Sequence, residues 1–487
     1  MSNATTSFPT TSRHLQTRGI SAATQAHIDA GLMSGRLPWP VLVYLFCVVV
    51  PIWFNAGPLL MSTLRLFLMV MIIPVMIRLL AGAYGRVILT DLLFVAHTLW
   101  MAVALGVNSP EAVVTQFGSV GMEFLGGYAI GRAYVRTPEV FLALCRALAL
   151  IVLCLTPFAI YEAQTGRPLI VEYIARLPGI NSVGIVTTEG RLGLERVQGP
   201  FAHPIHFGLF CSVAFSLTAV ALKGVVSNTR RWATAVVVAG VGFLGLSSGA
   251  WLAILLQIGL IFWATVFARV RWRWWLLVGL FALAYILIDI LSNRTPLRVF
   301  MSYATFSPHT AYWRGLIFEW GIANVLGSAE KGIPASPIFG IGMRDWVRPS
   351  YMNSGSMDNF WLVMAVRFGV PGFLFIAVGY ALVIAQVMRR DFTADSVLSQ
   401  IRRGWVFTFL GLTFTLCTVH VWTSLYSFVF FLFGAGVWLI AARSESGDDR
   451  AVVSVDESAY GRSQVGYSRF PATHNRTALS LQGHSRD

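Results

Sequence analysis

The chain has 487 residues, of which 56% are hydrophobic and only 12% are charged, and its mean hydropathy is +0.67. Soluble domains are about one-quarter charged, so this composition excludes a water-soluble globular protein and indicates a chain embedded in lipid. The net charge is +14, but much of the arginine lies at the ends of apolar segments. No nucleic-acid-binding module is present, so we expect no nucleic-acid partner.

Apolar segments of membrane-spanning length follow one another between two polar tails, residues 1–38 and 443–487. They are 39–55, 59–80, 87–107, 113–135, 140–160, 204–222, 232–246, 250–267, 274–291, 370–387, 405–421 and 425–442. We therefore predict an all-α, polytopic membrane protein with about twelve transmembrane helices in one domain over 39–442. The carboxyl-terminal tail has little apolar content, which predicts disorder.

Lysine and arginine lie in alternate short connections between these segments, beginning with Arg78 and Arg86. The short turns near 58, 108–110, 247–249 and 422–424 contain neither. By the positive-inside rule, the basic connections and both termini are cytoplasmic. Two long connections, 161–203 and 292–358, then lie outside, and we expect the second, between spans 9 and 10, to be a folded lid.

These two outer loops are rich in arginine, including Arg191, Arg196, Arg314 and Arg344. A guanidinium group presents a planar fork of donors that suits phosphate and carboxylate. A group of such forks near the membrane surface could hold a lipid diphosphate and stabilise it as it departs. Contact with lipid headgroups or salt bridges within the loops is the alternative interpretation for each arginine.

The segment that contains Arg196 and His203 leads directly into the span at 204–222. Two interpretations of His203 and His206 remain open, because their spacing suits a metal, whereas packing or substrate hydrogen bonding at the helix entry needs no further ligand. No third ligand is apparent, and the five cysteines lie in apolar segments without a metal-binding motif. We therefore expect no metal and no cofactor.

A second group of polar residues precedes the span at 370–387. Ser356 or Asp358 can cap a short helix that dips toward the membrane there. The Asp358 carboxylate can instead act as a general base for an acceptor hydroxyl, and both interpretations stay open. Arg367 lies in apolar sequence, so we expect it to face a cavity or a partner rather than lipid. The same argument applies to Arg65, Asp91, Glu123, Arg146 and Asp289.

Several stretches of the chain carry a resemblance to a known family when their order and spacing are taken together. They are RVQGPFAHPIHFG (196–208), LSSGAWLAI (246–254), YWRGLIFEWG (312–321), FGIGM (339–343) and MDNFWLVMAVRFGVPG (357–372). The chain resembles, over about 39–442, the O-antigen ligase and polysaccharide polymerase superfamily of bacterial inner membranes. This resemblance implies a helical fold like that of the GT-C glycosyltransferases.

The resemblance also implies a metal-independent, inverting glycosyl transfer at the periplasmic face, with a glycan on undecaprenyl diphosphate as the donor. Arg314 falls where the family places a functional arginine, and Asp358 falls where ligases carry a histidine before asparagine, here Asn359. The serine-rich turn ends in Gly249 where ligases often have arginine. Both departures favour a polymerase of exopolysaccharide or O-antigen repeat units. Arg344 and Gly355 match an arginine-to-glycine loop pattern of polymerases.

We therefore predict catalytic roles for Asp358 and Arg314. Substrate binding is predicted for Arg191, Arg196, His203, Arg344 and Asn359. Partners would be the lipid-linked glycan, membrane lipids, and polysaccharide export or chain-length proteins. Two alternatives remain open. One is an O-antigen ligase that transfers glycan to lipid A core or another acceptor, and the other is a transporter or flippase of lipid-linked glycans.

Overall fold

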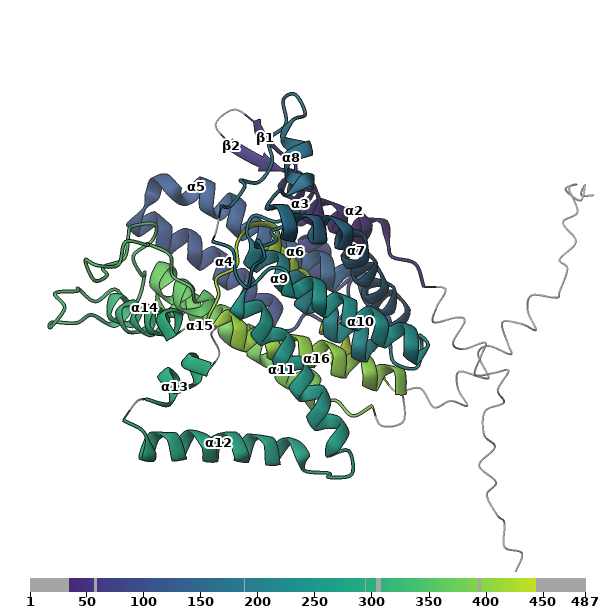
Figure 1. Ribbon diagram of the computed structural model, residues 1–487. Coiled ribbons are helices and arrows are strands. Elements are labelled where there is room, and N and C mark those ends of the chain that lie inside the picture. The colour runs from purple at the N-terminus through teal and green to yellow at the C-terminus, as the bar shows by residue number, and fades with distance from the viewer. Residues whose placement is uncertain are drawn as a thin grey trace, which may run out of the picture. The chain divides into compact units, whose positions relative to one another are not determined.

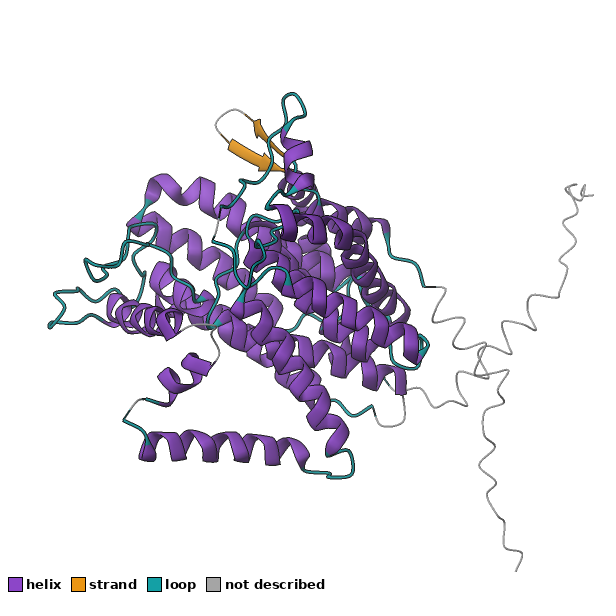
Figure 2. Cartoon of the chain, viewed as in Figure 1, coloured by secondary structure: helices purple, strands orange, loops and turns teal. Residues whose placement is uncertain are grey.

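The computed structural model describes residues 35–443 except 57–58, 188, 294, 304–307 and 393–395. These residues are mostly helical, with one two-stranded hairpin (Figures 1 and 2). The predictions for the tails concern residues 1–34 and 444–487, which lie outside the described residues.

The helices and strands of the first half of the chain are α2 (Trp39–Val49), β1 (Trp53–Ala56), β2 (Leu59–Ser62), α3 (Thr63–Leu80), α4 (Leu89–Asn108), η1 (Pro110–Ala112), α5 (Val113–Gln116), the π-helical turn η2 (Phe117–Gly121), α6 (Met122–Tyr134), α7 (Pro138–Thr165), α8 (Leu169–Ala175), α9 (Pro204–Ser216), the π-helical turn η3 (Leu217–Ala221) and α10 (Asn228–Phe243). The second half contains α11 (Ser248–Val266), α12 (Arg273–Leu291), α13 (Pro296–Tyr303), α14 (Pro308–Leu326), α15 (Phe360–Arg389), α16 (Ser396–Leu416), α17 (Thr423–Gly434) and η4 (Val437–Ile440).

Each of the predicted apolar segments contains helix in the structure. Within the described residues, 8 helices are long and apolar enough to cross a membrane. They are α3, α4, α7, α9 with η3, α11, α12, α15, and α17 with η4. Of the other segments, α2 has 11 residues, α10 has 16 and α6 has 13 after a π-helical turn, whereas α16 has 21 residues but is not among the eight. The structure thus confirms a mostly helical chain with several helices that could span a membrane, while the count of twelve spans stays a prediction.

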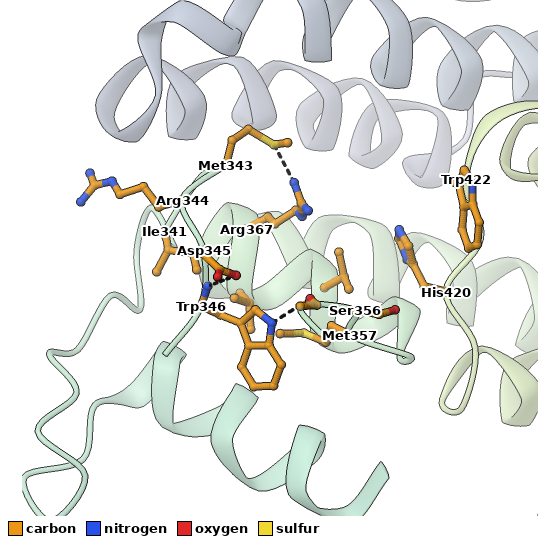
Figure 3. A pocket seen from close by; sticks show the side chains of 13 residues that line it. Ile341, Met343, Arg344, Asp345, Trp346, Ser356, Met357, Arg367, His420 and Trp422 are labelled. Carbon is orange, nitrogen blue, oxygen red and sulfur yellow. Dashed lines mark hydrogen bonds between the residues drawn. The ribbon is translucent and has the colours of Figure 1, made fainter. Parts of the chain in front are cut away.

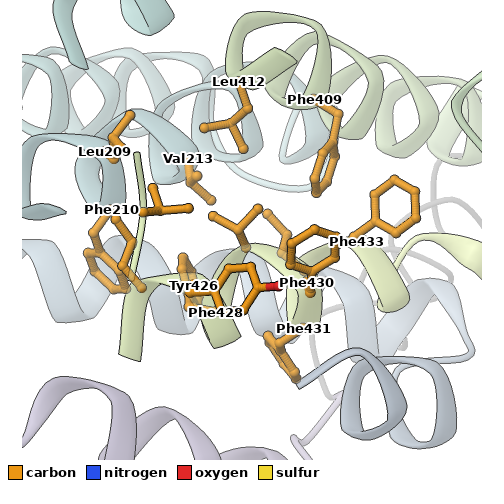
Figure 4. Packing of buried hydrophobic residues seen from close by; sticks show 14 of the residues in the cluster. Leu209, Phe210, Val213, Phe409, Leu412, Tyr426, Phe428, Phe430, Phe431 and Phe433 are labelled. Carbon is orange, nitrogen blue, oxygen red and sulfur yellow. The ribbon is translucent and has the colours of Figure 1, made fainter. Parts of the chain in front are cut away.

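Helix α17 forms the centre of the core. Its phenylalanines point in all directions, a pattern typical of a helix that is buried on every side (Figure 4). Side chains of α9 and α16 face it, and Phe430, Phe431 and Phe433 are fully buried. Its backbone also lies close to α6, where a Cβ atom on Gly131 would lie 2.0 Å from the Phe431 carbonyl oxygen. Only glycine allows this approach.

Charged residues within the helices find partners there, as expected. Arg65 Nε lies 2.8 Å from Glu123 Oε1, and Asp91 accepts hydrogen bonds from the Ile88 amide and the Tyr128 hydroxyl. Pairing removes the cost of burying a lone charge in an apolar medium. Asp289 differs, because it is exposed on α12, a helix that has no buried residues and extends away from the other long helices in Figure 1.

The connections that were predicted to lie outside contact one another at one end of the helices. The hairpin at β1 pairs with the first long loop through Trp53 and Asn181. Arg344 of the second long loop donates to the backbone oxygen of Asn108 at 3.2 Å, and Arg191 donates to that of Leu246 at 2.9 Å. These contacts agree with the predicted alternation of the segments. Which side of the membrane this end faces stays a prediction.

Helix α15 is broken near its start. Gly369 has φ of +72°, and a Cβ atom there would lie 2.0 Å from the Ile338 carbonyl oxygen. The break gives a short helix over 360–368 before the longer one, as the sequence predicted. The predicted cap was wrong, however. Asn359, and not Ser356 or Asp358, accepts the amide of Leu362 at 3.0 Å.

Candidate functional site

The buried guanidinium of Arg314 is one centre of the candidate site. It lies on α14, and its face of the helix is shared with Ile317, three residues further along, which is also buried. Nη2 donates to Ser248 Oγ at 3.4 Å, but Nε and Nη1 are buried and have no hydrogen-bond partner among the residues that the structure describes. Burial lowers the Arg314 pKa, and nearby Asp358 opposes this shift. Because arginine stays protonated in proteins, the structure holds a buried cation with two unused donors.

The first long loop is held in place by a buried carboxylate at the end of α7. Glu162 Oε1 accepts the amide of Gln198 at 2.7 Å, and Oε2 accepts the amide of Gly199 at 3.1 Å. Charge-assisted bonds of this kind are about twice as strong as neutral ones. They fix the loop between its two arginines, Arg191 and Arg196, and the start of α9.

Arg196 is a second cation without a carboxylate partner among the described residues. Its side chain is half-buried and Nε has no hydrogen-bond partner. Burial, and then the neighbouring charge of Arg191, lower its pKa to about 10. Arg191 is more exposed and is oriented by its bond to Leu246. The two positive charges repel each other, and the binding of an anion between them would relieve this repulsion.

His203 stands at the head of α9 and caps it. Its Nδ1 accepts the Ile205 amide at 3.1 Å, so in the neutral ring Nε2 carries the proton and is a donor. Burial, and then the charge of Arg196, lower the His203 pKa to about 4, although Asp358 acts in the opposite direction. The ring is therefore neutral at physiological pH.

A metal site is not formed around the two histidines. The described residues contain no group of three or more potential ligands that could hold a metal ion. His206 is fully buried with neither ring nitrogen hydrogen-bonded, and its ring centroid lies 4.0 Å from that of Trp422. The packing interpretation therefore describes His206 better than the metal one.

Asp358 completes the group. It is half-buried, and its Oδ1 accepts the Ser356 hydroxyl at 2.8 Å. Because Asn359 caps α15, the carboxylate of Asp358 is not used as a cap. It shifts the pKa of both Arg314 and His203, so it lies within electrostatic range of each. The two long loops and the start of α15 thus bring five predicted site residues together: Arg191, Arg196, His203, Arg314 and Asp358.

Two predicted site residues are not part of this group. Arg344 is exposed, and its Nη2 donates to Asn108 Oδ1 at 2.9 Å, which fastens the second loop to the end of α4. In Figure 3 its guanidinium points away from the other labelled side chains. The Oδ1 atom of Asn359 is occupied as the cap of α15. Asn359 therefore holds the start of α15 in position, whereas Arg344 fixes the second loop and also lines the cavity described next.

A cavity of about 360 Å³ adjoins the Asp358 segment (Figure 3). Its lining includes Ser356, Met357, Arg367, His420 and Trp422, and a second cavity of about 190 Å³ shares the last three. Arg367 was predicted to face a cavity, and the structure confirms this. His420 was missed, because it was placed at the end of an apolar span. In the structure α16 ends at Leu416, and the extended segment that follows brings His420 to the cavity.

No protein-family model and no curated protein matches the chain. A functional assignment therefore depends on the chemistry of these residues and on the resemblance of the short sequence stretches.

Proposed function

We propose that the chain is a polymerase that joins oligosaccharide repeat units carried on undecaprenyl diphosphate into exopolysaccharide or O-antigen. The reaction takes place at the periplasmic face of a bacterial inner membrane, in which both termini are cytoplasmic. The observation that carries the proposal is the pair of unpaired guanidinium groups, Arg314 and Arg196, grouped with the carboxylate of Asp358.

The cations fit an anionic donor. An unpaired charge in a poorly hydrated site is costly, and an opposite charge that satisfies its donors offsets that cost. Arg314 offers two free nitrogens and Arg196 one, and Arg191 adds a third positive charge nearby. A diphosphate presents several oxygens to such donors. The attraction grows as charge develops on the leaving diphosphate, so binding of this kind favours the transition state.

Asp358 suits the acceptor side of the reaction. The acceptor hydroxyl oxygen attacks the anomeric carbon of the donor, the bond from that carbon to the diphosphate oxygen breaks, and Asp358 takes the hydroxyl proton. One sugar–oxygen bond forms while one breaks, and the configuration inverts. His203 donates from Nε2 to a sugar or phosphate oxygen, since its Nδ1 is engaged at the helix cap.

The first experiment compares a deletion strain complemented with the wild-type chain or with Asp358→Ala. We expect Asp358→Ala to reach the membrane at wild-type levels while single lipid-linked repeat units accumulate on the outer leaflet. Finished polymer that accumulates on its lipid carrier would instead indicate the ligase, and repeat units retained on the inner leaflet would indicate the flippase. Normal polymer length in the variant would contradict the proposal.

A second experiment tests the predicted sidedness. A cysteine introduced as Ser354→Cys, next to the Asp358 segment, should react with a membrane-impermeant maleimide in spheroplasts. A cysteine introduced as Arg230→Cys, at the opposite end, should react only after permeabilisation. The native cysteines are first replaced, because Cys154 and Cys417 are exposed. Labelling of residue 354 only after permeabilisation would exclude a periplasmic reaction.

A further inference from the structure

Among the described residues, the guanidinium of Arg367 has a hydrogen-bond contact only with a poor acceptor. Arg367 lies in the short first part of α15, and its Nη1 contacts Met343 Sδ (Figure 3). A thioether sulfur is a weak acceptor and carries no charge. The guanidinium therefore keeps most of its capacity to bind an anion.

The carboxylates near Arg367 are already engaged by other arginines. Asp345 lines the same cavity, but its Oδ2 lies 2.6 Å from Arg348 Nη1. Glu123 lines the neighbouring cavity, where it pairs with Arg65. Among the described residues, no ion pair is formed by Arg367, so its charge is available to an anionic ligand in the cavity.

The broken helix explains how the cation is held without an acidic partner. Because α15 is interrupted at Gly369, Arg367 lies in the last turn of the short helix over 360–368, where a positive charge is favourable. The loop amides of Ile341 and Gly342 donate to the carbonyl oxygens of Val366 and Arg367, at 2.8 and 3.0 Å. Backbone hydrogen bonds therefore fix the position of Arg367.

The rest of the cavity suits a ring with polar edges. Trp422 is about one-third exposed and presents a flat aromatic surface. His420 has a buried Nδ1 without a hydrogen-bond partner, and Ser356 and Gly355 line the wall on the side of Asp358. The volume of about 360 Å³ lies within the range of small-molecule sites, roughly 300–1,000 Å³.

We infer that this cavity is a subsite for a sugar residue that bears a carboxylate, bound by Arg367 and stacked on Trp422. The sugar belongs to the acceptor chain, because Ser356 joins the cavity to Asp358 through their 2.8 Å hydrogen bond. The identification of the ligand as a sugar rests on the proposed function. The preference for an anion rests on Arg367 and its surroundings.

The experiment measures equilibrium binding to the full chain in detergent micelles by calorimetry. The probes are a tetrasaccharide of glucuronic acid, the neutral glucose tetrasaccharide of the same linkage, and acetate. The wild-type chain should bind the acidic tetrasaccharide about 10- to 100-fold more tightly than the neutral one, the range expected for hydrogen bonds to a charged group. Acetate should bind more weakly than the acidic tetrasaccharide.

Two variants and one control accompany these probes. Arg367→Gln should abolish the preference for the acidic tetrasaccharide, while Arg367→Lys keeps part of it, because lysine retains the charge but not the planar fork. Arg167→Gln, which removes an exposed arginine paired with Glu172, should bind like the wild type. Thermal unfolding of each variant identifies any loss of fold, and Arg367→Lys provides the comparison if Arg367→Gln fails to fold.

Equal affinity of the wild type for the acidic and neutral tetrasaccharides, or an unchanged preference in Arg367→Gln, would overturn the inference. Acetate binding as tightly as the acidic tetrasaccharide would show a site for small anions and overturn the assignment to a sugar. No turnover is measured here. A failure of the polymerase proposal, detected as normal polymer in Asp358→Ala, is therefore distinguishable from a failure of this subsite.

Discussion

The replacement Arg314→Met separates function from stability. Two of the guanidinium nitrogens are buried without partners, and each such group costs about 1–3 kcal/mol. Methionine has a side chain of similar length and no charge, so it removes this cost, while it loses the 3.4 Å bond to Ser248 and the attraction to Asp358. We expect the free energy of unfolding to stay equal or to rise by about 1–3 kcal/mol.

The same replacement should nearly abolish the reaction. Removal of one preorganised donor from a developing anion lowers kcat about 10²- to 10³-fold, and Arg314 supplies two. The assay follows polymer formation from lipid-linked repeat units in proteoliposomes, while unfolding in dodecyl sulfate gives the stability. Arg167→Met is the matched control, since the ion pair of Arg167 with Glu172 is exposed to solvent and adds little to stability. Full polymerisation by Arg314→Met, or a loss of stability beyond that of the control, would refute the argument.

The remaining predictions concern residues that belong to the candidate site or that hold its loops in position. Asp358→Asn should lower the polymerisation rate about 10²- to 10⁴-fold at unchanged stability. Asn359→Ala should instead cost about 0.5–2 kcal/mol of stability, because it removes the cap of α15. Equal effects of the two variants on stability would contradict this prediction. Glu162→Gln weakens the charge-assisted bonds that hold the loop of Arg196, so the thermal midpoint and the affinity for the lipid-linked donor should both fall, as measured by thermal unfolding and donor binding. Because the folded-state pKa of His203 is about 4, below its ordinary 6.5, the unfolded chain binds the proton more readily between these values. Stability is therefore lost as pH falls from about 6.5 to about 4, and His203→Gln should reduce this slope when unfolding is compared at pH 7 and pH 5; an unchanged slope would show that His203 does not contribute.

The positions of the helices could be predicted from apolar periodicity, whereas the pairing of charges could not. Arg65 and Glu123 lie 58 residues apart, and nothing in the local sequence links them. The need of Arg367 for a cavity was predictable, because an arginine in an apolar segment cannot face lipid cheaply. Its isolation from carboxylates was not, since this depends on Asp345 and Glu123 being engaged elsewhere.

The start of α15 shows where local rules fail. Ser356, Asp358 and Asn359 are all good capping residues, so propensity alone does not choose among them. A tertiary hydrogen bond determines which of the three residues is the cap. The Phe360 amide donates to the Val419 carbonyl oxygen at 3.2 Å. This contact sets Asn359 as the cap and leaves the Asp358 carboxylate available. The same extended segment carries His420, for which no glycine or proline in the sequence signals the end of α16.

The interruption of α15 at Gly369 has a consequence for how such a chain can change its specificity. The loop is joined to the short helix through main-chain groups, including the Ile341 amide and the Val366 carbonyl. The frame of the cavity is therefore independent of most side chains that line it. Substitutions at Met343 or Arg367 can therefore change the chemistry of the cavity wall while the backbone that forms the cavity stays in place.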